Sequence, residues 1–131
     1  MLLIDWPDIA VPEGLARAGH DVWVKGGPGE DDYARWPESD GEVVAGAKGP
    51  GPERADMVYM FRPLEEAPAV VGLARSLGAR TLWHQSGRDE NGRRDPKGVW
   101  LSPEDAARLG RLVTAAGLVL VWDRYILDGS V

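Results

Sequence analysis

Residues 57–87 read MVYMFRPLEEAPAVVGLARSLGARTLWHQSG, and this stretch decides the fold. A short apolar run from Met57 to Phe61 is followed by apolar residues at helical spacing from Leu64 to Leu77, and Gly78 ends that pattern. A second apolar run, Arg80 to His84, comes next. A strand, a helix and a strand with short connections predict a βαβ unit, which requires parallel strands and a right-handed crossover.

The sequence on both sides of this unit continues the same alternation. We predict strands at Leu2 to Ile4, Asp21 to Val24 and Leu118 to Trp122. We predict helices at Pro12 to Ala18 and at Pro103 to about Ala116, the second with Ser102 as its N-cap. This alternation predicts an α/β fold, a Rossmann-like doubly wound parallel sheet of about five main strands in the order 3-2-1-4-5-6. We expect residues 26–53 to be loop-like, with a short edge strand at Glu42 to Ala45, and residues 1–131 to form one domain.

Composition narrows the class of protein. The chain has 131 residues, a net charge of −6 and no cysteine, so disulfides and thiolate metal sites are excluded. Its apolar runs are shorter than the roughly 20 residues of a membrane span, and the N-terminus lacks the features of a signal peptide. We therefore expect a cytoplasmic protein that binds neither membranes nor nucleic acid.

Ligands of doubly wound sheets bind outside the carboxyl ends of the strands, where the strand order reverses. The residues that follow the predicted strands are therefore the candidates for ligand binding. They are Asp5, Trp6, Lys25, Gly26, Arg62, Gln85, Gly87, Asp123 and Arg124.

Three of the charged candidates have a structural alternative. Asp5 could bind a ribose hydroxyl, an amine or a metal, or it could cap the next helix. Arg62 suits a phosphate or carboxylate ligand, and the alternative is a surface ion pair. Lys25 with the glycines at positions 26, 27 and 29 could form an anion cradle, or the segment could be a plain turn.

Catalytic and metal-binding signals are weak. His84 is the candidate general base, although a buried structural histidine fits the same pattern, and Ser86 lacks the G-x-S-x-G motif of an activated nucleophile. The acidic run at residues 30–32 could join Asp5 and Asp8 at a divalent metal, but the spacing matches no metal motif. We predict no catalytic residue other than the candidate His84, and no metal site.

The chain has six tryptophans, and four adjoin strand ends or polar loops. Trp6 and Trp122 could form the walls of a site for a planar ligand such as adenine. Trp36 and Trp100 lie in polar loops, where exposure would indicate a lid or a subunit contact, so a homodimer is one expectation.

The order and spacing of several short motifs resemble the stand-alone CoA-binding Rossmann domains, which are similar to the N-terminal domain of succinyl-CoA synthetase α subunits. The motifs are Phe61-Arg62-Pro63, Gly78-Ala79, Leu82-Trp83 with Gln85 and Gly87, Ala116-Gly117-Leu118 and Asp123-Arg124. The resemblance implies a small cytoplasmic protein that binds CoA or an acyl-CoA and carries no catalytic residues of its own. It also implies a glycine-rich, phosphate-binding turn after the first strand.

At that position this chain reads DWPDIAVP, residues 5–12, without a glycine. Two carboxylates would face a phosphate there, and Pro7 and Pro12 lack N–H donors. The insert from Asp89 to Trp100 is also longer than the family's loop, and Tyr125 stands where many members have a cysteine.

Three functions therefore stay open. The first is a non-catalytic module for CoA, an acyl-CoA or a related nucleotide. The second is an enzyme or accessory protein of small-molecule metabolism that uses Asp5, Asp8 and His84. The third is a ligand-free scaffold that dimerises.

Overall fold

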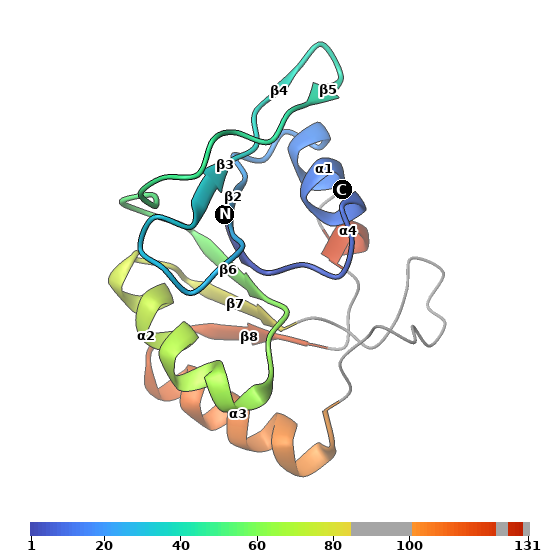
Figure 1. Ribbon diagram of the computed structural model, residues 1–131. Coiled ribbons are helices and arrows are strands. Elements are labelled where there is room, and N and C mark those ends of the chain that lie inside the picture. The colour runs from blue at the N-terminus through green and yellow to red at the C-terminus, as the bar shows by residue number, and fades with distance from the viewer. Residues whose placement is uncertain (85–100, 123–125, 130–131) are drawn as a thin grey trace.

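The computed structural model describes residues 1–84, 101–122 and 126–129. Its main sheet has six strands in the order β3-β2-β1-β6-β7-β8 (Figure 1). The strands are β1 (Leu2–Ile4), β2 (Trp23–Lys25), β3 (Tyr33–Arg35), β6 (Met57–Met60), β7 (Thr81–His84) and β8 (Val119–Val121). All neighbours pair in parallel except β3, which is antiparallel to β2. The predicted Rossmann-like α/β fold is confirmed, and so is the order of its five main strands, β2-β1-β6-β7-β8.

The predicted edge strand at Glu42 to Ala45 is wrong. The edge is β3, whose Ala34 is buried and pairs with Val24. Instead, β5 (Glu42–Val43) pairs with β4 (Glu38–Ser39) in a separate two-stranded hairpin. The two residues between them, Asp40 and Gly41, both have positive φ, at 52° and 82°. An Asp-Gly pair in this conformation is a hairpin turn that pairs its flanking residues locally, so this segment does not join the main sheet.

Helices cover both faces of the main sheet (Figure 1). On one face lie η1 (Leu64–Glu66), α2 (Ala67–Ser76) and α3 (Pro103–Ala115), and on the other lie α1 (Ala10–Arg17) and α4 (Ile126–Gly129). Ser102 caps α3 as predicted, because its Oγ accepts the N–H of Asp105 at 3.1 Å. Among the helices of the described residues, none has the length and apolar character needed to cross a membrane.

Alternation along the strands divides the core into two parts. Leu2, Val58 and Leu82 pack under α2 and α3, whereas Leu3 and Tyr59 pack under α1 and α4. These five side chains are fully buried, and burial of each such side chain contributes about 1.5–3 kcal/mol. The register pairs Ile4 with both Lys25 and Met60, and Met60 with His84. The carboxyl ends of β1, β2, β6 and β7 therefore lie level at one edge of the sheet.

Candidate functional site

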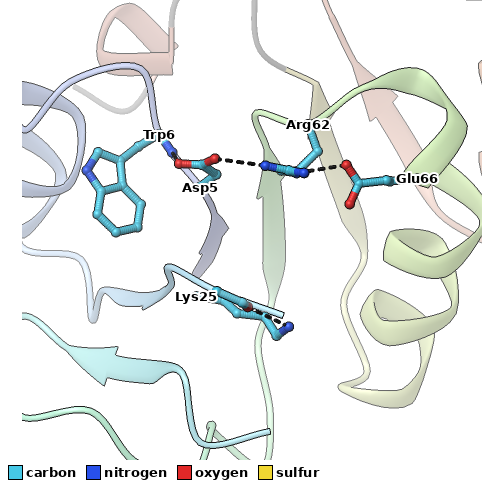
Figure 2. Close-up of polar contacts among 6 residues, drawn as sticks. Asp5, Trp6, Lys25, Arg62 and Glu66 are labelled. Atoms are coloured by element: carbon cyan, nitrogen blue, oxygen red, sulfur yellow. Dashed lines mark hydrogen bonds and ion pairs between the residues drawn. The ribbon is translucent and has the colours of Figure 1, made fainter. Parts of the chain in front are cut away.

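The strand order reverses between β1 and β6, and an ion pair spans this position. Nη1 of Arg62 donates to Oδ2 of Asp5 at 3.2 Å, and Nε of Arg62 donates to Oε2 of Glu66 at 2.8 Å (Figure 2). Asp5 directly follows β1, Arg62 follows β6, and Glu66 ends η1. The place where ligands of such sheets bind thus holds a chain of three alternating charges.

The backbone holds Asp5 in position for this contact. Its φ is 62°, in the left-handed region that aspartate tolerates better than most residues. Its N–H donates to the carbonyl of Lys25 at 3.1 Å, and its Oδ1 accepts the N–H of Trp6 at 2.9 Å. Asp5 therefore forms a turn and an ion pair. The predicted alternative, in which Asp5 caps the next helix, is not what the structure shows: the N–H of Ala10 at the start of α1 bonds the side chain of Asp8 instead.

Arg62 is fixed on both sides by carboxylates. The hydrogen bond that Arg62 donates to Glu66, and then the one that it donates to Asp5, raise the pKa of Arg62 above its ordinary value, so the guanidinium keeps its charge. The three side chains are each about 40% exposed, at 41%, 42% and 44%. Solvent screening makes such ion pairs weak, so a ligand anion can exchange with either carboxylate at low cost.

The segment after β2, residues 26–32, is called the second loop here, and residues 5–9 after β1 are called the first loop. Asp32 closes the second loop: its Oδ2 accepts the N–H of Gly29 at 2.7 Å, and its carbonyl accepts the N–H of Gly26 at 3.2 Å. Two backbone donors of the predicted anion cradle, the N–H groups of Gly26 and Gly29, are therefore bonded to the protein's own Asp32. Lys25 remains beside it, with Nζ donating to the carbonyl of Gly27 at 3.0 Å.

Two hollows lie at these strand ends. The smaller has a volume of about 130 Å³ and the larger about 370 Å³, and they share Ile4, Lys25, Pro28 and Glu66. Asp5, Gly26, Gly27 and Arg62 complete the lining of the smaller one. Tyr33 and apolar side chains of α2, among them Val70 and Leu73, line the larger one. The lining combines two cations and an apolar wall with the carboxylates of Asp5, Glu30 and Glu66. The cations and the apolar wall suit an anionic ligand that also has an apolar part.

Tyr33 borders the larger hollow beneath a cation. Nζ of Lys25 lies 5.5 Å from the centroid of the Tyr33 ring, a distance suited to a cation–π contact. Burial, and then the charge of Glu30, raise the pKa of the Tyr33 hydroxyl above its ordinary value. The hydroxyl is therefore protonated at neutral pH and can donate a hydrogen bond.

The first loop leads into α1, and its donors are also occupied. Oδ1 of Asp8 accepts the N–H of Ala10 at 2.8 Å, and the carbonyl of Asp8 accepts the N–H of Val11 at 3.2 Å. Pro12 has no N–H, and the N–H of Glu13 is bonded to the carbonyl of Ile9 at 3.2 Å. Residues 10–13 of α1 thus offer no unbonded N–H to a ligand.

His84 does not join Asp5 and Asp8. Its side chain is 1% exposed, and its pairing with Met60 places it on the α2 and α3 face of the sheet. The strand β6 separates β7 from β1, so His84 and Asp5 belong to strands that lie roughly 10 Å apart. The predicted catalytic grouping of Asp5, Asp8 and His84 is not brought together.

The tryptophans take different positions. Trp36 is buried, and its ring meets that of Trp6 edge to face with centroids 5.9 Å apart, so Trp36 is not an exposed lid. Trp6 packs against the core under α1, whereas Trp122 is 42% exposed. The remaining predicted candidates, Gln85, Ser86, Gly87, Trp100, Asp123 and Arg124, lie outside the described residues.

Sequence reasoning missed Glu66, Tyr33 and the role of Asp32. The i, i+4 spacing of Arg62 and Glu66 is typical of an ion pair on a helix and was a usable signal. A carboxylate close behind a glycine-rich turn was a signal for Asp32, because aspartate side chains commonly bond nearby backbone N–H groups. Tyr33 offered no signal, because its place depends on the antiparallel β3.

A comparison with protein families bears on this site. A family model described as a CoA binding domain matches residues 11–127. The matched range includes Lys25 and Arg62, and it begins after the first loop, so Asp5 and Asp8 lie outside it. No solved structure matches the chain.

Proposed function

Because the chain belongs to the family of CoA-binding domains, we propose that it is a non-catalytic binding module for CoA or an acyl-CoA. The two hollows at the carboxyl ends of β1, β2 and β6 are the proposed place of binding. The observation that carries the proposal is that residues of the family match line both hollows at the point where the strand order reverses.

The residues present suit part of such a ligand. Lys25 and Arg62 are the cations that would attract its phosphates, with Arg62 exchanging one of its carboxylate partners. Ile4, Val70 and Leu73 offer an apolar wall, and the Tyr33 ring offers a surface for stacking. Together these groups would bind and orient the ligand without changing it.

The arrangement of the other candidates supports a role without catalysis. A general base must come within hydrogen-bonding reach of a reacting group, and the buried His84 does not line either hollow. Asp5 is bonded to Arg62 and to the N–H of Trp6. In the described part of the chain, no group of three or more histidine, aspartate or glutamate residues could hold a metal ion.

Calorimetric titration with CoA and acetyl-CoA tests the proposal, with ATP and NAD as competing nucleotides. We expect Lys25→Ala to weaken CoA binding about tenfold, because it removes a charge-assisted hydrogen bond worth about 1.5–3 kcal/mol. Arg62→Ala should weaken binding less, because Asp5 and Glu66 already balance the charge of the guanidinium.

The matched control is Arg75→Ala. Arg75 lies in the last turn of α2 and lines a separate hollow with Leu77 and Gly78, away from the carboxyl ends of the strands. We expect this variant to bind as the wild type does. A wild-type protein that binds neither CoA nor acetyl-CoA, or an equal loss in all three variants, would contradict the proposal.

A further inference from the structure

The N-terminus of α1 does not fit a diphosphate, and we propose that Asp8 is the specificity-determining residue responsible. In doubly wound sheets, a ligand phosphate lies against the backbone N–H groups at the start of the helix that follows the first strand. Here the Asp8 carboxylate occupies that place, so a CoA-type ligand binds with its diphosphate elsewhere. This inference rests on the proposed function.

The backbone donors in the first turn of α1 already have partners. A phosphate at a helix N-terminus is bound by N–H groups that have no partner within the helix. In α1 the N–H of Ala10 bonds the Asp8 carboxylate at 2.8 Å, and that of Val11 bonds the Asp8 carbonyl. Pro12 replaces a third donor. Asp8 and Pro12 together leave the first turn with its donors satisfied.

The charged side chains near the start of α1 are mainly carboxylates. Glu13 lies in the first turn of α1, and the loop that leads into the helix carries two more carboxylates, Asp5 and Asp8. The cations near them have carboxylate partners already: Arg62 pairs with Asp5, and Arg17 pairs with Glu13 at 3.4 Å. A diphosphate entering here would meet like charges, and such contacts oppose binding.

The backbone of the first loop is poorly suited to close approach by a phosphate. A phosphate needs close approach to the backbone, which glycine permits because it has no Cβ. Residues 5–9 contain no glycine, and Pro7 fixes the backbone between the two aspartates. By contrast, the two hollows lie on the β2 and α2 side of Asp5 and do not include Asp8 in their lining.

Titration of four proteins with two probes tests the inference. The proteins are the wild type, Asp8→Asn, Asp8→Gly and a control, Asp40→Asn, in the β4–β5 turn. The probes are CoA and pantetheine, which lacks the diphosphate. Asn keeps the cap without the charge, and Gly removes the side chain at little cost to the helix.

We expect CoA to bind Asp8→Asn about threefold more tightly and Asp8→Gly about tenfold more tightly than the wild type. Pantetheine binding should not change in any variant, and Asp40→Asn should match the wild type with both probes. Circular dichroism checks that the variants keep their helix content.

The outcomes separate the inference from the proposed function. CoA binding that is unchanged or weaker in both Asp8 variants, or a gain shared equally by pantetheine, overturns the inference alone. CoA binding by Asp8→Gly but not by the wild type supports the inference and overturns the proposed function. Failure of CoA to bind any of the four proteins overturns both.

Discussion

The first and second loops follow neighbouring parallel strands at the same edge of the sheet. In each, an aspartate side chain bonds a backbone N–H, but the two loops differ in sequence. The first loop has Pro7 and no glycine, and it places Asp8 on the N–H of Ala10. The second loop has three glycines and places Asp32 on the N–H of Gly29. In both, a carboxylate of the chain bonds one backbone donor that would otherwise be available to an anion.

The two loops differ in what they leave for a ligand. The charged side chains of the first loop are both carboxylates, and the nearby Arg62 is bonded to Asp5 and Glu66. The second loop follows Lys25, whose ammonium has three N–H donors, of which the described structure shows one bonded to the Gly27 carbonyl. We infer that ligand affinity in this protein depends on side-chain cations at the second loop and little on the first.

Gly27→Ala, in the second loop, should have the largest effect on the free energy of unfolding. A Cβ at position 27 would lie 2.5 Å from Oδ2 and 2.8 Å from Cγ of Asp32, which must then release the N–H of Gly29. We expect the free energy of unfolding to fall by about 1–3 kcal/mol, measured by urea denaturation.

Gly26→Ala is the matched control. Its Cβ would come no closer than 3.5 Å to the Trp6 ring, an ordinary contact, so its stability should stay within about 0.5 kcal/mol of the wild type. Equal stability of the two variants would show that Asp32 does not close the second loop.

A smaller difference is expected between Asp32→Ala and Asp8→Ala. Asp8→Ala removes the exposed hydrogen bond between the Asp8 side chain and the N–H of Ala10 and should cost about 1 kcal/mol. Asp32→Ala should cost somewhat more, because it leaves a half-buried N–H without its acceptor and also removes the ion pair with Lys48 at 3.9 Å. The measurement is urea denaturation of both variants beside Asp31→Ala, an exposed neighbour that should be neutral. The reverse order would mean that the first loop is the more tightly closed.

The smallest expected effect is on the pH dependence of the protein's stability, to which Tyr33, directly after the second loop, contributes. Because the pKa of Tyr33 is raised in the folded state above the ordinary value of 10.0, its contribution to stability is present below pH 10. That contribution is lost as the pH rises through the folded-state pKa. Thermal melts from pH 8 to 11 should show a shallower fall for Tyr33→Phe than for the wild type. Parallel pH profiles would contradict this.

Much of the fold could be predicted because it depends on local patterns. The helix ends at Gly19, Gly78 and Gly117 have positive φ, as a glycine just past a helix permits, and Ser102 caps α3. The strand order followed from the alternation of strands and helices. The prediction misplaced the edge strand, because β3 has no strand pattern in its own sequence and forms by pairing with β2.

The site was predicted less completely. Strand ends indicated Asp5, Lys25 and Arg62, since parallel strands bring their carboxyl ends to one edge. The sequence could not show that Arg62 bonds both Asp5 and Glu66, because the Asp5 contact joins residues 57 positions apart. It likewise could not show that Trp36 is buried against Trp6.

The sequence by itself determined the family, the parallel sheet and the edge of the sheet at which a ligand would bind. These depend on apolar periodicity and on residues that end helices and strands, which act over a few positions. Only the tertiary structure decided which polar groups are already bonded to one another. Asp8 and Asp32 each act over two or three positions, but whether the donors they bond would face a ligand depends on how β1, β2 and β6 align. The bonds from Ala10 to Asp8 and from Gly29 to Asp32 form locally, and the register of β1 and β2 brings both to the edge of the sheet at which a ligand would bind.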